Sequence, residues 1–186
     1  MNNRVTIGLL LILVILGLYL YFFELNEPNQ DLFDENAILI PGFGSYDEFD
    51  IVGLEIDGPQ GSVQFARTSD TLSQPWEMLQ PEALPSDAVD QVRVNGTAVR
   101  LGRLTANQVI SSTDLVQYGL SPPELTVTLT ISNGDKVVFY TGNQTPVNYS
   151  YYMQPETDSE SIYVVFSVAV TELHRLLAEI PLVPTP

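Results

Sequence analysis

The stretch YGLSPPELTVTLT, residues 118–130, combines a turn, two adjacent prolines and a strongly alternating strand pattern. Gly119 permits a positive φ angle, and the prolines at 122 and 123 restrict the backbone that enters the strand. Apolar side chains then alternate with hydroxyl side chains, which is typical of a strand with one buried face and one polar face. The apolar set is Leu125, Val127, Leu129 and Ile131. Because this alternation fixes the register of the strand, the stretch predicts a fold element rather than a ligand-binding motif.

The neighbouring segments predict antiparallel hairpins around this strand. Asn133-Gly134 is typical of a two-residue type I′ turn, and KVVFYTG, residues 136–142, has the composition of the returning strand. Farther along, YSYYMQ (149–154) and SIYVVF (161–166) predict two more strands, separated by the polar loop PETDSE. Upstream, FDIVGLEIDGPQGSVQFART (49–68) has two apolar runs on either side of Gly-Pro-Gln-Gly, which predicts another hairpin.

One helix is predicted to begin at Ser86 or Asp87, both good N-cap residues, and to end near Leu104. Inside it, Asn95-Gly96 lies between alternating apolar residues, which is also typical of a two-residue hairpin. The helix is preferred, because apolar and basic side chains separate onto opposite sides of a helical wheel. The apolar side holds Val92, Val94, Ala98, Val99 and Leu101, and the opposite side holds Arg93, Arg100 and Arg103.

A second helix is predicted at VAVTELHRLLAEI, residues 168–180, directly before a proline. Its buried side is predicted to hold Val170, Leu173, Leu177 and Ile180. The segments 74–87, which contains Trp76, and 106–123 are interpreted as connections between these elements.

Residues 6–23, TIGLLLILVILGLYLYFF, carry no charge, and 18 residues at about 1.5 Å each span roughly 27 Å, close to the thickness of a bilayer core. They predict an uncleaved transmembrane anchor, with Arg4 on the cytoplasmic side and acidic residues outside. The alternative is a cleaved signal peptide, which needs a shorter apolar region followed by small residues. The residues expected in the anchor include Thr6, Leu10, Leu13, Leu16, Tyr19 and Phe23.

The predicted organisation is a cytoplasmic flank (1–5), the anchor (6–23), an acidic tether (24–48), an ectodomain (49–181) and a short tail (182–186). The tether contains one apolar island, AILI, that predicts a short strand. The fold class is therefore α+β: an N-terminal transmembrane helix followed by an extracytoplasmic domain of antiparallel β-hairpins with two packed helices.

Composition excludes several kinds of function. The 186 residues contain no cysteine, so a disulfide, a thiolate nucleophile and a cysteine-ligated iron–sulfur cluster are excluded. The net charge is −16, from seven Lys or Arg and 23 Asp or Glu, so binding to nucleic acid or to anionic lipid headgroups is not expected. The acidic surface either keeps the domain soluble or binds a basic partner.

No catalytic or cofactor site is predicted. The single histidine, His174, lies at the apolar edge of the second predicted helix, where a structural or surface role is expected. The acidic runs 31–35 and 46–50 do not have the ligand spacing of an EF-hand loop, and the glycines form neither GxGxxG nor a phosphate-binding loop. We therefore expect no enzymatic activity, no cofactor and no bound metal.

Two groups of residues are candidates for binding. Arg93, Arg100 and Arg103 either pair with carboxylates of the same domain or form a surface for docking a partner. The tyrosines Tyr149, Tyr151 and Tyr152, together with Tyr163 and Phe166 on the next strand, either fill the core of the sheet or stack on a sugar or an apolar peptide.

The segments PWEMLQPEALPSDAVDQ, DLVQYGLSPPELTVTLTISNGDKVVFYTGNQTP, SIYVVF and LLAEIP, in this order, resemble the bacterial family called domain of unknown function 4340. The similarity covers roughly residues 49–181, and its most specific piece is YGL-x-x-P followed by two strands and a G-x-x-T-P loop. Members of that family are typically anchored by one N-terminal helix, and many are encoded beside gliding-motility-type ABC transporter components. The resemblance implies no catalytic residue.

The sequence thus predicts a non-catalytic accessory or assembly subunit of a larger bacterial membrane complex, either a transporter or an electron-transfer complex. Its partners are expected to be other subunits of that complex, with the lipid bilayer contacted through residues 6–23. Its location is expected to be the cell membrane, with the N-terminus in the cytoplasm and the domain outside. The alternative is a module that binds envelope glycan or peptide.

Overall fold

A computed structural model describes residues 37–43, 46, 50–67, 75–147 and 149–183, all within Ala37–Pro186, one of the two units into which the chain divides. The strands are β1 (Ile38–Leu39), β2 (Ile51–Gly58), β3 (Gly61–Ala66), β4 (Glu77–Gln80), β5 (Thr105–Ser111), β6 (Leu125–Ile131), β7 (Lys136–Gln144), β8 (Tyr151–Pro155) and β9 (Ser161–Val165). The helices are α2 (Gln91–Gly102) and α3 (Ser167–Ala178). These elements confirm the α+β class.

The predicted flank and anchor, and most of the predicted tether, lie outside the described residues. Neither helix in the part of the chain that the structure describes is long and apolar enough to span a bilayer.

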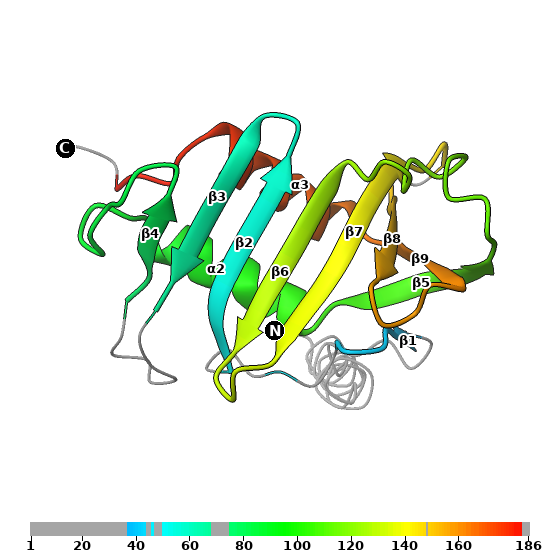
Figure 1. Ribbon diagram of the computed structural model, residues 1–186, viewed down its shortest axis with the longest axis horizontal. Helices are drawn as coiled ribbons and strands as arrows, with labels where there is room; N and C mark the ends of the chain where they lie inside the picture. The colour runs from blue at the N-terminus through cyan, green and yellow to red at the C-terminus, as the bar shows by residue number, and fades with distance from the viewer. Residues whose placement is uncertain (1–36, 44–45, 47–49, 68–74, 148, 184–186) are drawn as a thin grey trace, which may run out of the picture. The chain divides into compact units, whose positions relative to one another are not determined.

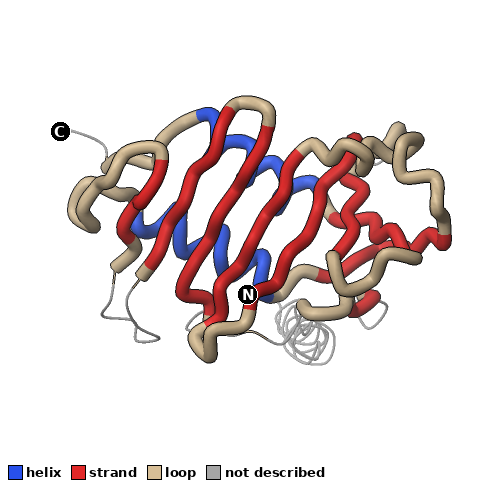
Figure 2. Tube along the Cα trace, in the orientation of Figure 1, coloured by secondary structure: helices blue, strands red, loops and turns tan. Residues whose placement is uncertain are grey.

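All nine strands form one antiparallel sheet with the order β1-β5-β9-β8-β7-β6-β2-β3-β4 (Figure 1). The pairing of β2 with β6 joins two meanders, β2-β3-β4 and β6-β7-β8-β9. β5 follows α2 in the chain but pairs with β9 near the far edge. Both helices lie on one face of the sheet, behind it in the view of Figure 2, and none of the described residues forms a helix on the opposite face. The structure therefore has a covered face and an open face.

The hairpin that follows the opening stretch is confirmed, but its turn is longer than predicted. The amide of Ile131 donates to the carbonyl of Asp135 (2.8 Å), so residues 132–134 form a three-residue loop. Gly134 has a φ of 93°, and the Asn133 side chain accepts a hydrogen bond from the amide of Asp135 (2.9 Å). Such a loop needs one residue in the left-handed conformation, and Gly134 occupies that position. A type I′ turn would need two residues with positive φ angles.

Trp76 shows why the segment with Asn95-Gly96 is a helix and not a hairpin. Its indole Nε1 donates to Asn95 Oδ1 (3.3 Å), and the Gln91 side chain accepts from the Trp76 amide (2.6 Å) and donates to the Trp76 carbonyl (2.8 Å). The guanidinium of Arg67 lies 4.9 Å from the centroid of the indole ring. Tertiary contacts with a buried tryptophan thus outweigh the local turn preference of Asn-Gly.

The predicted start of this helix at Ser86 or Asp87 is wrong. The N-cap is Asp90, whose carboxylate accepts from the amides of Val92 and Arg93 (both 3.1 Å). Val89 instead forms an isolated antiparallel bridge with Leu182, flanked by hydrogen bonds from the amide of Asp90 to the carbonyl of Pro181 and from the amide of Val183 to the carbonyl of Ala88. A backbone paired in this way cannot also form a helical turn.

Two residues were assigned to the wrong side of their helices. Val92 is predicted on the apolar side but is 84% exposed, because at about 100° per residue it lies roughly opposite Val94, which is buried. Ile180 was placed on the buried side of the last helix, yet α3 ends at Ala178 and Ile180 is largely exposed.

Two strands, β4 and β5, lie in segments that were interpreted as connections. β5 has four exposed residues among its seven and no alternation in burial, so its sequence lacks the pattern of a half-buried strand. β4 has only four residues and one buried side chain. Both lie near the ends of the sheet, where the sequence constraint on a strand is weak.

Gly119→Ala should destabilise the protein more than Gly134→Ala, although both glycines have positive φ angles (70° and 93°). A Cβ at 119 would lie 2.8 Å from the backbone nitrogen of Asn143, whereas at 134 it would meet nothing within 4 Å. We expect a loss of about 1–2 kcal/mol at 134 from the backbone angle alone, and about 1–3 kcal/mol more at 119 from the close contact. Urea unfolding of the full chain, followed by the fluorescence of its single tryptophan, measures both. Equal losses would contradict the steric argument.

Candidate functional site

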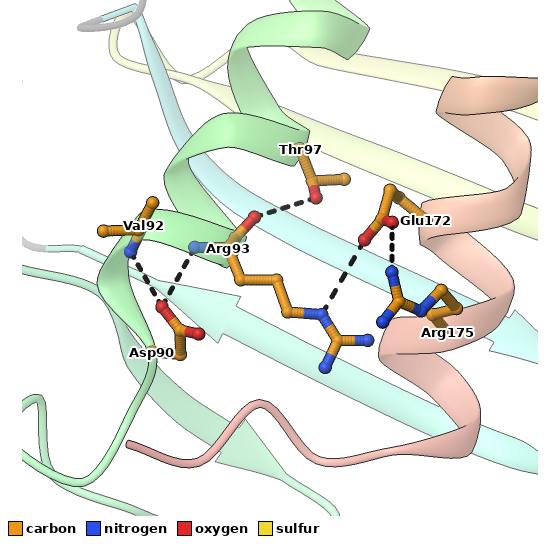
Figure 3. A network of polar contacts seen from close by, with 6 residues as sticks. All are labelled: Asp90, Val92, Arg93, Thr97, Glu172 and Arg175. Carbon is orange, nitrogen blue, oxygen red and sulfur yellow. Dashed lines mark hydrogen bonds and ion pairs between the residues drawn. The ribbon is translucent and has the colours of Figure 1, made fainter. Parts of the chain in front are cut away.

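Arg93 faces α3 and is not an accessible docking residue. Its Nε lies 3.7 Å from Oε2 of Glu172, and the other carboxylate oxygen of Glu172 accepts from Arg175 Nη1 (2.8 Å), as Figure 3 shows. The side chain of Arg93 is only 19% exposed. Of the two interpretations of the arginines, pairing with a carboxylate of the same domain is therefore the correct one for Arg93.

The guanidinium of Arg93 has incomplete hydrogen bonding among the described residues. Its Nε and Nη2 are buried, and neither donates a hydrogen bond within the part of the chain that the structure describes. Glu172 balances the charge but does not provide a hydrogen bond, because 3.7 Å is beyond hydrogen-bonding distance. The ion pair is thus needed mainly to offset the buried charge.

The other two predicted arginines are exposed. Arg100 lies in the last turn of α2, where a positive charge interacts favourably with the helix dipole, and Arg103 is the C-cap residue. Together α2 and α3 contain three of the chain's seven basic residues, Arg93, Arg100 and Arg175, and one of its 23 acids, Glu172. The residues of α2 and α3, here called the helix layer, are therefore locally positive in a strongly acidic protein, and the excess is smaller when the cap residues Asp90, Arg103 and Glu179 are included.

The three candidate tyrosines separate to different places. Tyr151 lies half-buried on the covered face, where its ring is 6.0 Å from that of His174 on α3. Tyr152, the next residue, points to the open face and makes an edge-to-face contact with Tyr118 (4.8 Å between centroids). Tyr149 lies in the loop before β8, with a φ of 50°, and is largely exposed. Core filling thus explains Tyr151 but not the other two.

The other residues named in the sequence analysis, His174, Tyr163 and Phe166, lie in different environments. His174 lies 3.7 Å from Glu124 Oε1 and is partly exposed, as expected for a surface histidine. Tyr163 is buried in the core cluster, whereas Phe166, the N-cap of α3, is exposed. No group of three His, Asp or Glu suited to a metal ion occurs among the residues that the structure describes.

A pocket of about 320 Å³ lies beside Tyr152. Asn107, Gln108 and Ile110 of β5 form one wall, and Val147, Tyr152 and Val164 form the others. Because β5 and β8 are brought together only by β9, residues about 40 positions apart in sequence meet here. Sequence reasoning named Tyr152 but missed the pocket, because it interpreted residues 106–123 as a connection.

The loop that carries Val147 is fixed by its own hydrogen bonds. The amide of Thr145 donates to the carbonyl of Ser150 (2.7 Å), and the Thr145 hydroxyl donates to the carbonyl of Val147 (2.6 Å). The Thr145 hydroxyl also accepts from the amide of Ser150 (3.1 Å). These bonds hold the exposed side chain of Val147 at the rim of the pocket.

An acidic turn lies between β8 and β9, near the same end of the sheet as Ser111. It contains Glu156, Asp158 and Glu160 and no basic residue. The hydroxyl of Tyr163 donates to Asp158 (2.8 Å) and lowers the pKa of that carboxyl, while burial and the Asp158 carboxylate raise the pKa of Tyr163. Asp158 therefore keeps its negative charge at neutral pH.

A family model described as a domain of unknown function, DUF4340, matches residues 76–179, which is more than half of the chain. The chain belongs to the DUF4340 family. Neither a curated protein nor a solved structure matches the chain. The DUF4340 match begins at Trp76, so the hairpin β2–β3 precedes it, although the resemblance was expected from residue 49. Both helices and all the residues that line the Tyr152 pocket lie within the match.

In the DUF4340 domain, Glu172→Gln should lower the free energy of unfolding by about 1–2 kcal/mol, because it leaves Arg93 charged and without a counter-charge. Arg93→Met removes the buried charge and keeps the apolar stem, so we expect a change below about 1 kcal/mol. Urea unfolding followed by tryptophan fluorescence compares the two. If Arg93→Met were the more damaging change, the ion pair itself would be a net source of stability.

Tyr163→Phe should destabilise the domain in a pH-dependent way. The hydrogen bond lowers the pKa of Asp158, so its stabilisation is complete above the carboxyl's unfolded pKa and is lost as the pH falls through the lowered folded value. The difference in unfolding free energy between parent and variant should therefore be present at neutral pH and shrink between about pH 4 and pH 2. A difference that did not vary with pH would show that Asp158 does not contribute.

Proposed function

We propose that this chain is a non-catalytic accessory or assembly subunit of a larger bacterial membrane complex, anchored by residues 6–23, with its DUF4340 domain outside the cytoplasm. The observation that supports this proposal is the local positive charge of the helix layer, which is defined as the residues of α2 and α3 without their cap residues. Its partner is an acidic surface on another subunit of the complex. The host complex is a transporter or an electron-transfer complex.

The outer surface of the helix layer has the character of a polar protein interface. Arg100 and Arg175 are exposed, and the exposed apolar side chains Val92 and Val168 lie on the same two helices. Arginine with scattered apolar residues is common at interfaces between proteins. On a chain of net charge −16, an acidic partner is expected to approach such a surface more readily than the acidic parts of the protein, so the charge distribution favours one docking orientation.

The test is purification of the tagged full-length chain in mild detergent, followed by native mass analysis of the proteins that remain bound. We expect partners in a fixed ratio. Arg100→Glu should reduce their recovery about tenfold or more, because like charges across an interface are strongly unfavourable. Lys136→Glu is the matched control, since Lys136 is also exposed and the charge change is the same, but it lies on β7 outside the helix layer.

Added salt should weaken the complex of the parent protein, because exposed charge pairs are screened. A chain that purifies alone, or equal recovery with Arg100→Glu and Lys136→Glu, would overturn the proposal.

A second candidate function, binding of envelope glycan or peptide, is supported by the pocket beside Tyr152. The residues that line the pocket come from β5, β8, β9 and the loop after β7, and none comes from α2 or α3, so the pocket is separate from the helix layer.

A further inference from the structure

One wall of the Tyr152 pocket is a row of side chains that crosses three strands. Gln108 of β5 lies opposite Val164 of β9, and Val164 lies opposite Tyr152 of β8. Side chains directly opposite each other point to the same face of a sheet, and these three line the pocket together. Their neighbours in the chain, Met153 and Val165, point to the other face, where they belong to the buried core. Strand pairing therefore fixes the shape of this wall.

The loop between β7 and β8 supplies the second wall. Thr145, Pro146, Val147 and Ser150 line the pocket, and the hydrogen bonds described above join Thr145 to Val147 and to Ser150. Ser150 is only 3% exposed. Both walls are thus held in place before a ligand arrives, which lowers the conformational entropy that is lost on binding.

Two side-chain amides in the pocket, those of Asn107 and Gln108, are available to a ligand. Both residues are exposed and line the pocket. Neither side chain forms a hydrogen bond within the part of the chain that the structure describes. Each amide has two N–H donors and one carbonyl acceptor. A ligand with several hydroxyl groups, each of which both donates and accepts, matches this pair.

The lining of the pocket carries no charge. All nine described residues that line it are apolar or are polar without an ionisable group that is charged at neutral pH. A charged ligand would lose water there without gaining a counter-charge, which is unfavourable. An anionic ligand would also be repelled by a chain of net charge −16. The pocket therefore favours an uncharged ligand.

The apolar part of the lining fits the face of a ring. The ring of Tyr152 packs edge-to-face on Tyr118, with 4.8 Å between centroids, and Ile110, Val147 and Val164 add aliphatic surface. A sugar ring has hydroxyl groups around its edge and C–H groups on its faces, so it matches both the amides and this apolar surface. At about 320 Å³ the pocket is at the small end of ligand-binding cavities, so it holds one ring rather than a polymer chain.

We propose that the Tyr152 pocket binds one uncharged sugar unit, whose hydroxyl groups bind the amides of Asn107 and Gln108 and whose ring packs on Tyr152. This proposal rests on the second candidate function, binding of envelope glycan or peptide, and selects the glycan. It is independent of docking through the helix layer, because no residue of α2 or α3 lines the pocket. Of the three candidate tyrosines from the sequence, Tyr152 is the one that lines it.

The test is saturation-transfer difference NMR on the full-length chain in a detergent without a sugar headgroup. The probes are the methyl glycosides of glucose, galactose, mannose and N-acetylglucosamine, and the corresponding uronic acids and amino sugars are the charged comparators. We expect at least one methyl glycoside to bind. Its charged comparators should bind about tenfold more weakly or worse, because the pocket offers them no counter-charge. A blocked, uncharged tripeptide, acetyl-Ala-Val-Ala-amide, is titrated in parallel.

Gln108→Leu should weaken binding of the glycoside about tenfold or more, because it leaves sugar hydroxyl groups without partners. Gln60→Leu is the matched control: Gln60 is also exposed but lies in the β2–β3 turn, away from the pocket lining, and binding should not change. Tyr152→Ala should also weaken binding, whereas Tyr149→Ala, at an exposed tyrosine that does not line the pocket, should not. Urea unfolding followed by tryptophan fluorescence checks that each variant is folded.

Three results would overturn the proposal: no methyl glycoside binds, the charged comparators bind equally well, or Gln108→Leu and Gln60→Leu bind the glycoside equally. If the tripeptide alone binds and Gln108→Leu weakens it, this proposal fails while the second candidate function stands as peptide binding. If neither probe binds, both fail. Gln108→Leu should leave the recovery of partners in mild detergent unchanged, so helix-layer docking is tested separately.

Discussion

The antiparallel pairing of β2 with β6 is the contact on which the other elements depend. In it, Leu54 lies opposite Leu129 and Ile56 opposite Val127, and all four side chains are buried beneath the helices. Alternation of apolar and polar residues on both strands sets this register, since a slip of one residue would turn every apolar side chain to the open face. Each meander then grows outward from this pair, one toward β4 and the other toward β9.

One apolar face on the sheet requires one helix layer, and the two halves of the chain each supply a helix to it. Both α2 and α3 belong to this layer, so no helix of the described residues covers the opposite face of the sheet. The two candidate interaction sites follow from this arrangement. The helix layer presents its outer, arginine-bearing surface, and the end of the sheet formed by β8, β9 and β5 presents a pocket.

Sequence reasoning succeeded where a local pattern carries the structural information. The alternation at 125–131 predicted β6, and the Gly-Pro-Gln-Gly segment predicted the β2–β3 turn. It failed where a distant contact decides: the start of α2 depends on residues 181–183, and the Tyr152 pocket depends on β5 meeting β9. The arginines are a further example. A helical wheel groups them on one side of α2 but cannot show that Arg93 forms an ion pair with Glu172 on α3.

The position of β5 also sets an order of events during synthesis. Its main neighbour, β9, is made about 50 residues later in the chain, so β5 lacks its pairing with β9 while β6, β7 and β8 are still forming. Pairings between segments so far apart are slow to form, and a strand that waits for them is prone to join the wrong chain. Polar residues such as Asn107 and Gln108 help to keep this strand soluble during that interval. They also interrupt the apolar–polar alternation by which a strand is predicted from the sequence.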